Sequence, residues 1–220
     1  SYDDVYNSVY NDSKFMDLYH WGVFVCTFAW EHHVKIYNLY RKSFLPLLNT
    51  KEGCLLDLGC GSGVWSFLTT HFLPQWTSHG IDISKKSIEL STNMAKSSGL
   101  DNKVNFKEFD ATTFKGAEKY NAAVSCFVIE HLEEPQHLLL NIASNLETKG
   151  YAFVTAALTA AEVDHITEFR RESEIVLMAE EAGFRVLSMY SSAPPYHPDS
   201  QRFLPRALGL VLQKRKNNIW

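Results

Sequence analysis

The segment Leu55–Gly63, with the sequence LLDLGCGSG, constrains the fold more than any other part of the chain. It begins as an apolar run typical of a β-strand and ends in three glycines at alternate positions, and a segment with helical periodicity, 64–72, follows at once. Glycine allows a tight turn and a close approach to a ligand, because no Cβ is in the way. A helix behind such a turn offers unpaired N–H groups and the positive end of its dipole. The segment therefore predicts a nucleotide-type site at the edge of an α/β sheet.

The spacing of the glycines separates two kinds of nucleotide site. The fingerprint of dehydrogenases is Gly-x-Gly-x-x-Gly, and its third glycine would fall where Val64 stands. The segment instead resembles the first motif of class I S-adenosylmethionine-dependent methyltransferases, in which a strand ends in an acidic residue followed by Gly-x-Gly-x-Gly. Asp57 takes the acidic position, and Gly59, Gly61 and Gly63 take the glycine positions. The resemblance implies S-adenosyl-L-methionine as the cofactor and S-adenosyl-L-homocysteine as its product.

The order of the remaining elements also resembles this family, over roughly residues 50–215. Apolar patterning and turn residues predict strands at 53–58, 78–83, 103–108, 120–127, 151–158, 184–191 and 207–214, and helices at 31–48, 64–72, 84–98, 135–150 and 171–181. Five strand–helix units and a final pair of strands without an intervening helix are expected in this chain and match the order of the family, in which the seventh strand inserts antiparallel beside the fifth. The expected fold is α/β: a seven-stranded Rossmann-like methyltransferase sheet with helices on both faces and an N-terminal helical cap.

Two parts are expected, an N-terminal helical cap at 1–50 and a cofactor-binding core at 51–220. The first part is dense in aromatic residues. These either pack against the helices of the sheet or form a lid that closes over the cofactor and shapes a substrate pocket. Tyr19 and Trp21 are the candidates to close over the methionine moiety.

The second strand is expected to end beside Asp82, which stands 21 positions after Gly61. A carboxylate at this place can accept hydrogen bonds from both hydroxyls of a ribose, and the resemblance implies that role. The alternative for Asp82 is an N-cap of the following helix, although Ser84 fits the cap better. Ile83 would pack on one face of the adenine ring.

Five residues complete the cofactor site that the resemblance implies. Asp110 would accept from the adenine amino group, and the N–H of Ala111 would meet a ring nitrogen; an aspartate that only begins a loop is the alternative. Asp57 would orient the glycine turn and meet the methionine ammonium, in part through water. Cys60 belongs to the turn, and Phe127 would lie under the methionine end.

Methyl transfer from a sulfonium is an in-line displacement, in which the enzyme aligns the acceptor and, where needed, removes a proton. His131, after the fourth strand, and His165, after the fifth, are the predicted catalytic residues, because imidazole titrates near neutral pH. A structural hydrogen bond is the alternative for His131, and a surface helix face for His165. His32 and His33 form a third candidate.

No metal site is expected. Some members of the family bind a divalent cation through Glu-x-x-Glu-His after the fourth strand. Here Phe127 replaces the first acid and removes an oxygen ligand, and His137 does not restore the set.

The composition of the chain argues against some classes of binding partner. The formal net charge of −4 argues against a general nucleic-acid binder, and the basic run 214–216 is expected to be solvated. The four cysteines lack metal-like Cys-x-x-Cys spacing and are expected to be free thiols in a reducing compartment. Without a signal peptide or a run of membrane-spanning length, the chain is expected to be cytoplasmic, without a membrane partner, and either monomer or homodimer.

These observations predict a methyltransferase that modifies oxygen or nitrogen of a small, aromatic or heterocyclic metabolite. The Asn-Pro-Pro-Tyr motif of enzymes that methylate base or amide nitrogens is missing after the fourth strand, where SCFVIEHL stands. The alternative is a catalytically silent subunit that binds S-adenosylmethionine and supports a partner. A nicotinamide dehydrogenase is disfavoured by the glycine spacing.

Overall fold

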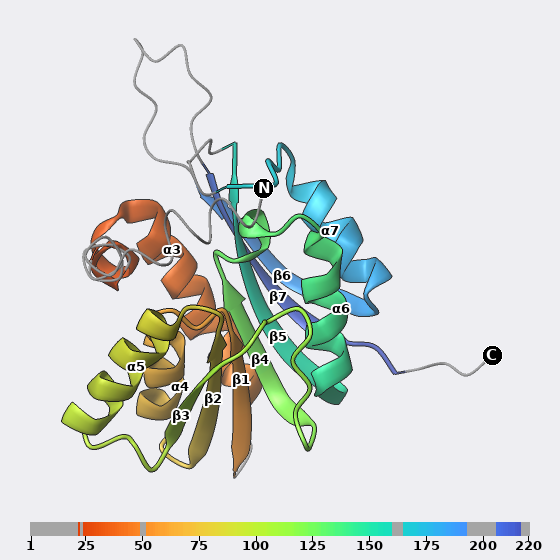
Figure 1. The fold of residues 1–220 in the computed structure, drawn as a ribbon. Coiled ribbons are helices and arrows are strands. Elements are labelled where there is room, and N and C mark those ends of the chain that lie inside the picture. Colours follow the sequence, from red (N-terminus) through yellow and green to blue (C-terminus); the bar gives the residue numbers. More distant parts are fainter. Residues whose placement is uncertain (1–21, 23, 49–51, 160–164, 193–205, 217–220) are drawn as a thin grey trace.

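Seven strands form one mixed sheet in a computed structural model that describes residues 22, 24–48, 52–159, 165–192 and 206–216. The strand order is β3-β2-β1-β4-β5-β7-β6 (Figure 1). The first five strands are parallel, and β7 runs antiparallel to both of its neighbours, β5 and β6. The bounds are β1 Gly53–Leu58, β2 Trp76–Asp82, β3 Val104–Glu108, β4 Tyr120–Cys126, β5 Leu146–Leu158, β6 Phe184–Ser192 and β7 Arg206–Lys214. The predicted fold class, with the seventh strand beside the fifth, is confirmed.

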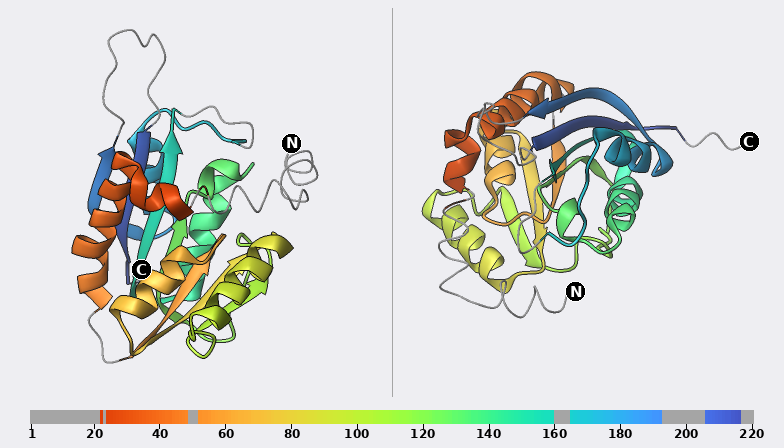
Figure 2. Two further views of the ribbon diagram at one scale, coloured as in Figure 1. Left: turned by 90° about the vertical axis from the view of Figure 1, so that its left-hand side faces the viewer. Right: turned by 90° about the horizontal axis from the view of Figure 1, so that it is seen from above.

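Helices cover both faces of this sheet (Figures 1 and 2). Helices α3, α4 and α5 lie on one side, and α6 and α7 lie on the other. The bounds are α3 Glu31–Leu39, α4 Val64–Phe72, α5 Lys85–Ser97, α6 Pro135–Asn145 and α7 Glu172–Glu181, with a 3-10 turn, η4, at Ile129–His131. No helix within the described ranges is both long and apolar enough to cross a membrane.

The two-sided cover explains why the central strands are almost wholly apolar. Leu55 packs with Ala122 and Val124 into one core cluster, whereas Leu56 and Ala123 belong to the cluster on the opposite face. All five are 0% exposed. A strand that is buried on both faces has no solvent side on which polar residues could alternate.

The helix that precedes β1 is part of the core. The expected helix 31–48 is continuous in the chain but changes pitch, from α3 into a π-helical turn, η2 (Tyr40–Phe44), and a 3-10 turn, η3 (Leu45–Leu48). Tyr40 and Phe44 are fully buried, and both rings contact Phe153 of β5. The packing interpretation therefore holds for these two aromatic residues, while the division into a cap and a core near residue 50 stays a prediction.

Two expectations about the helices were wrong. The helix predicted to reach residue 150 ends at Asn145, and Leu146 already begins β5, where it pairs with Tyr120. Leu146 is buried at 1% exposure, and an apolar residue at that position suits a helix and a strand equally well. Residues 109–119 contain no α-helix, so β3 and β4 are joined by turns and only four strand–helix units form. Buried Ala111 and Phe114 lie on that connection, within the core cluster on the α6 and α7 side.

Candidate functional site

The glycine turn joins β1 to α4 in a conformation that the sequence makes possible. Gly59, Gly61 and Gly63 all have positive φ, at 73°, 51° and 78°, which is the left-handed region that other residues rarely adopt. The N–H groups of Gly59 and Cys60 both donate to the carbonyl of Ile81, at 2.7 and 3.0 Å. The turn is therefore hydrogen-bonded to the end of the neighbouring strand β2.

Packing inside the protein also requires glycine at two of these positions. A Cβ on Gly59 would lie 2.3 Å from Cγ2 of Val128, and one on Gly63 would lie 2.6 Å from the ring of Phe106. Cys60 is 4% exposed, and its sulfur lies 3.0 Å from the place where a Cβ on Gly80 would stand. The Cys60 side chain therefore points toward β2, and its predicted contact with a cofactor stays a prediction.

Asp57 lies beneath the turn and is 1% exposed. Its Oδ2 accepts hydrogen bonds from the N–H of Ser66, at 3.2 Å, and from the Ser66 hydroxyl, at 2.7 Å. Its Oδ1 is buried with no hydrogen-bond partner among the described residues. Burial raises the pKa of Asp57 to about 7, although the hydrogen bonds from Ser66 act in the opposite direction. A cation or a water at Oδ1 would satisfy this oxygen and favour the charged carboxylate.

Asp82 connects the end of β2 with the glycine turn. Its Oδ2 accepts from the N–H of Gly61 and its Oδ1 from the N–H of Ser84, both at 2.8 Å. Burial raises the pKa of Asp82, and these backbone hydrogen bonds lower it. The Ser87 side chain and the N–H of Ile83 also act on this carboxylate, so a ribose would share its about four acceptor positions with these donors. Ser84 is the N-cap of α5, as the sequence predicts, and accepts from the N–H of Ser87. Ile83 follows directly and is partly buried.

Asp110 follows β3 and begins a turn. Its Oδ1 accepts from both the N–H and the hydroxyl of Thr112, each at 2.7 Å, so the loop-initiating role is present in the structure. Ala111 is 9% exposed, and its carbonyl accepts from the side chain of Asn141. The adenine contacts of both residues stay predictions.

Together the three carboxylates follow the order of three neighbouring strands. Asp57 lies in β1, Asp82 ends β2, and Asp110 follows β3, and these strands are adjacent in the sheet. An elongated ligand along this edge would meet an acceptor at three successive places. S-Adenosylmethionine has three groups that need acceptors, namely an ammonium, a ribose diol and an adenine amine, so the residues present fit it.

Phe127 stands directly after β4 in a conformation that is unusual for an aromatic residue. Its φ is +55°, and such strain persists where the surrounding structure holds it. Its N–H donates to the Thr155 hydroxyl at 3.0 Å. Its ring stacks on His33 of α3, with centroids 4.8 Å apart and an angle of 10° between the planes. Burial lowers the pKa of His33 to about 4, so this imidazole is neutral at pH 7.

His131 and His165 come together although they are far apart in the sequence. Their rings lie 5.0 Å apart, edge to face, and both are partly buried. Glu130 joins them: one ligand atom from each of the three side chains lies within 4.8 Å of the others. The cluster is not predicted from the sequence, because His165 follows a different strand from Glu130 and His131. A signal was present, since His131 follows the fourth predicted strand and His165 the fifth, and β4 and β5 are parallel neighbours whose carboxyl ends meet at one edge.

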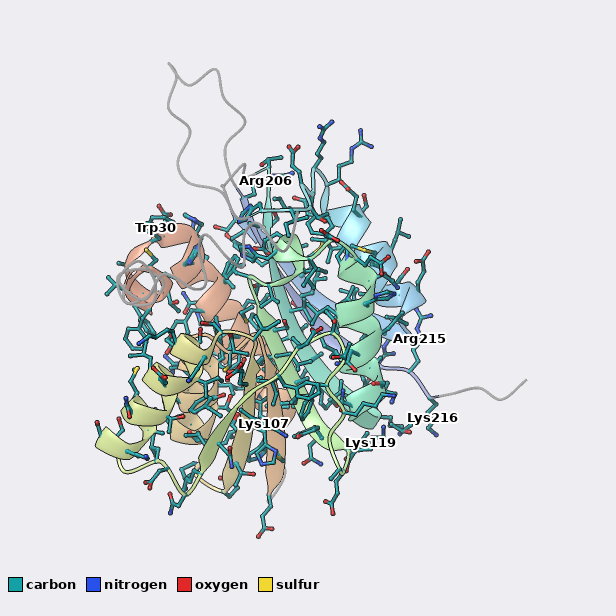
Figure 3. All side chains as sticks on the ribbon, in the orientation of Figure 1. Trp30, Lys107, Lys119, Arg206, Arg215 and Lys216 are labelled. Carbon is teal, nitrogen blue, oxygen red and sulfur yellow. The ribbon has the colours of Figure 1, made fainter. Side chains whose placement is uncertain are left out.

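Other predicted residues lie away from this edge or outside the description. His137 lies on α6 with its side chain 59% exposed, 2.8 Å from Glu134. In Figure 3, Trp30 and Arg206 lie at the upper end of the molecule, whereas Arg215 and Lys216 of the basic run lie at the lower right. Tyr19 and Trp21 fall outside the described residues.

Comparison with known proteins decides the family. A family model described as a methyltransferase domain matches residues 49–193, more than half of the chain. The chain belongs to the class I S-adenosylmethionine-dependent methyltransferases. The matched range contains the glycine turn, the three carboxylates and the histidine cluster.

Among curated proteins, the chain is similar to a ubiquinone biosynthesis O-methyltransferase of Rickettsia canadensis, with 29% identity over 102 residues. That match covers 46% of this chain and 41% of the relative. The chain thus spans less than half the length of the first curated relatives that it matches.

Solved structures share the fold at low sequence identity. One is an O-methyltransferase from a trans-AT PKS multienzyme of Brevibacillus brevis, in complex with S-adenosyl-L-homocysteine; its TM-score is 0.66 at 16% identity, with 83% of this chain and 71% of that chain covered. Another is the (4+2)-cyclase SpnF, with a TM-score of 0.68 at 15% identity and coverage of 82% and 80%. Since one neighbour is named a cyclase, this fold alone does not fix the reaction.

Proposed function

We propose that the protein transfers a methyl group from S-adenosylmethionine to oxygen or nitrogen of a small, aromatic or heterocyclic metabolite. The observation that carries this proposal is the row formed by Asp57, Asp82 and Asp110 along the glycine turn, in a chain of this family. Oxygen is the favoured acceptor atom, because the curated relatives are named O-methyltransferases.

Different residues of the chain are proposed to bind the cofactor and to contact the acceptor. Asp57 would hold the methionine ammonium at its unpartnered oxygen, and Asp82 would orient the ribose. S-Adenosylmethionine, when bound, supplies a methyl carbon attached to a positively charged sulfur. His131 and His165, after β4 and β5, are assigned to the acceptor. A neutral imidazole can take the proton that a hydroxyl acceptor loses.

The N-terminal aromatic residues would form the acceptor pocket. Phe28 and Trp30, 43% and 53% exposed, precede α3, and His33 connects that helix to Phe127 by stacking. Flat rings hold an aromatic acceptor at little cost in side-chain entropy. The proposal that this N-terminal segment acts as a lid also depends on the stacking of His33 on Phe127.

The experiment uses purified protein and S-adenosylmethionine labelled in its methyl group. The label should move to one member of a panel of phenols, hydroxylated heterocycles and aromatic amines, and S-adenosylhomocysteine should bind in calorimetry whereas NAD should not. Asp82→Ala serves as the control with weakened cofactor binding. Failure to bind S-adenosylhomocysteine would refute the proposal outright.

A second candidate is a cofactor-binding protein that transfers no methyl group. This candidate is supported by the structural similarity to a protein that is named a cyclase and not a methyltransferase. Tight binding of S-adenosylhomocysteine without transfer of label to any acceptor on the panel would support this second function over the first.

A further inference from the structure

We propose that Glu130, His131 and His165 form a binding site for one divalent transition-metal ion. One ligand atom from each side chain lies within 4.8 Å of the other two. Three ligand atoms that share one zinc ion, each about 2.1 Å from it, are about 3.4–3.6 Å from one another. The three side chains therefore need to move together by about an ångström to share an ion, a shift within the reach of side-chain rotation.

The backbone holds the ligands in place. The carbonyl of Glu130 accepts hydrogen bonds from the N–H groups of Ile166 and Thr167, at 3.0 and 2.9 Å. The Thr167 hydroxyl donates to the carbonyl of Leu132 at 2.6 Å. These three hydrogen bonds join the segment that contains His165 to the turn that contains Glu130 and His131. Hydrogen bonds around the ligands commonly hold the ligands of a metal site in position.

The Glu130 carboxylate is itself oriented by the sheet. Its Oε1 accepts from the N–H of Ala157 in β5, at 3.1 Å, and the residue is 1% exposed. A buried carboxylate is costly unless positive charge or hydrogen bonds compensate it. A dication between this carboxylate and two imidazoles would supply that charge.

The ligand types indicate which metals would bind. Two imidazoles and one carboxylate suit zinc, cobalt, manganese or ferrous iron, whereas magnesium prefers oxygen ligands only. Three protein ligands leave at least one coordination position open, as in catalytic zinc sites. The sequence alone argued against a metal because Phe127 replaces an acid; in the folded chain His165 supplies a third ligand instead.

The role of the ion rests on the proposed function. A hydroxyl acceptor at the open position would ionise more readily and release its proton to water. The acceptor oxygen then bonds to the methyl carbon, and the carbon–sulfur bond breaks with its electron pair left on sulfur. In this arrangement His131 and His165 are ligands, and neither serves as the base.

The test measures binding of Co²⁺ and Zn²⁺ alone to tag-free protein that has been treated with a chelator. The wild type should bind one ion, and Co²⁺ should give a visible absorption spectrum that differs from the aquo ion. His131→Ala and His165→Ala should weaken Zn²⁺ binding at least tenfold. His137→Ala is the matched control, because His137 is an exposed histidine on α6 outside the cluster, and it should bind as the wild type does.

Thermal unfolding and S-adenosylhomocysteine affinity show whether each variant is folded, and both should stay close to the wild type. The proposal is overturned if the wild type binds neither ion, or if folded His131→Ala and His165→Ala bind Zn²⁺ as the wild type does. Metal binding without methyl transfer would refute the proposed function and leave the metal site standing. Undiminished methyl transfer after chelation would refute the role of the ion in the reaction.

Discussion

Replacing Asp57 by asparagine tests two separate effects of this carboxylate, its effect on the pH dependence of stability and its proposed contact with the cofactor. The wild-type carboxyl has a pKa of about 7 in the folded protein, against an ordinary value of 3.8, because it is buried. The folded chain therefore keeps a proton that the unfolded chain releases between these values. The stability that this group contributes is fully present below about pH 4 and is lost as the pH rises through about 7.

The magnitude follows from the same two values. Between about pH 5 and pH 7 the two states differ by one proton, at about 1.36 kcal/mol for each pH unit. The wild type should therefore lose about 2.5 kcal/mol more of its free energy of unfolding between pH 5 and pH 8 than Asp57→Asn. Urea denaturation at the two pH values measures this difference. Asp101→Asn, in an exposed turn, is the matched control and should keep the wild-type dependence.

The Asp57→Asn substitution should reduce the loss of stability at high pH but weaken cofactor binding. At pH 8 the Asp57 carboxylate is charged, and an ammonium at Oδ1 would satisfy the oxygen that has no hydrogen-bond partner among the described residues. Asp57→Asn should bind S-adenosylhomocysteine at least tenfold more weakly, measured by calorimetry. A variant with wild-type pH dependence of stability would refute the reasoning from burial. A variant with wild-type affinity would refute the ammonium contact.

Three other substitutions test the site. Asp82→Ala should weaken S-adenosylhomocysteine binding by on the order of 2 kcal/mol, because a charge-assisted pair is lost; unchanged calorimetric affinity would end the ribose assignment. Gly59→Ala should destabilise the fold by about 1–3 kcal/mol, since its Cβ would lie 2.3 Å from Val128 Cγ2 at a φ of +73°. Adding Val128→Ala should recover part of that loss in thermal unfolding, and a neutral Gly59→Ala would contradict the turn geometry. His33→Ala should cost about 1 kcal/mol of stacking on Phe127 at pH 7, and His33→Phe should retain it. With a pKa near 4, stability from a neutral His33 is present above about pH 6.5 and is lost as the pH falls through 4; equal stability of both variants would show that the stacking is not stabilising.

Local sequence was sufficient for the glycine turn and its neighbours. The alternate glycines, the acid at position 57 and the serine cap at position 84 act over a few residues, so their effect on the backbone can be read from the chain. The end of α6 could not be read in this way. Leu146 is buried in either state, and its pairing with Tyr120 of β4 decides that it begins a strand.

The sequence by itself determined the order of the elements along the chain, the glycine turn and the family. These depend on apolar periodicity and on glycine conformation, which are local properties. Only the tertiary structure brought Glu130 and His131 against His165 and stacked His33 on Phe127. Both contacts join residues that lie far apart in the chain. The carboxyl ends of β4 and β5 meet at one edge of the sheet and bring the histidine cluster together, whereas His33 reaches Phe127 from α3. Along that edge the residues proposed for the cofactor belong to the sequence motif, whereas the residues proposed for the acceptor come together only in the fold.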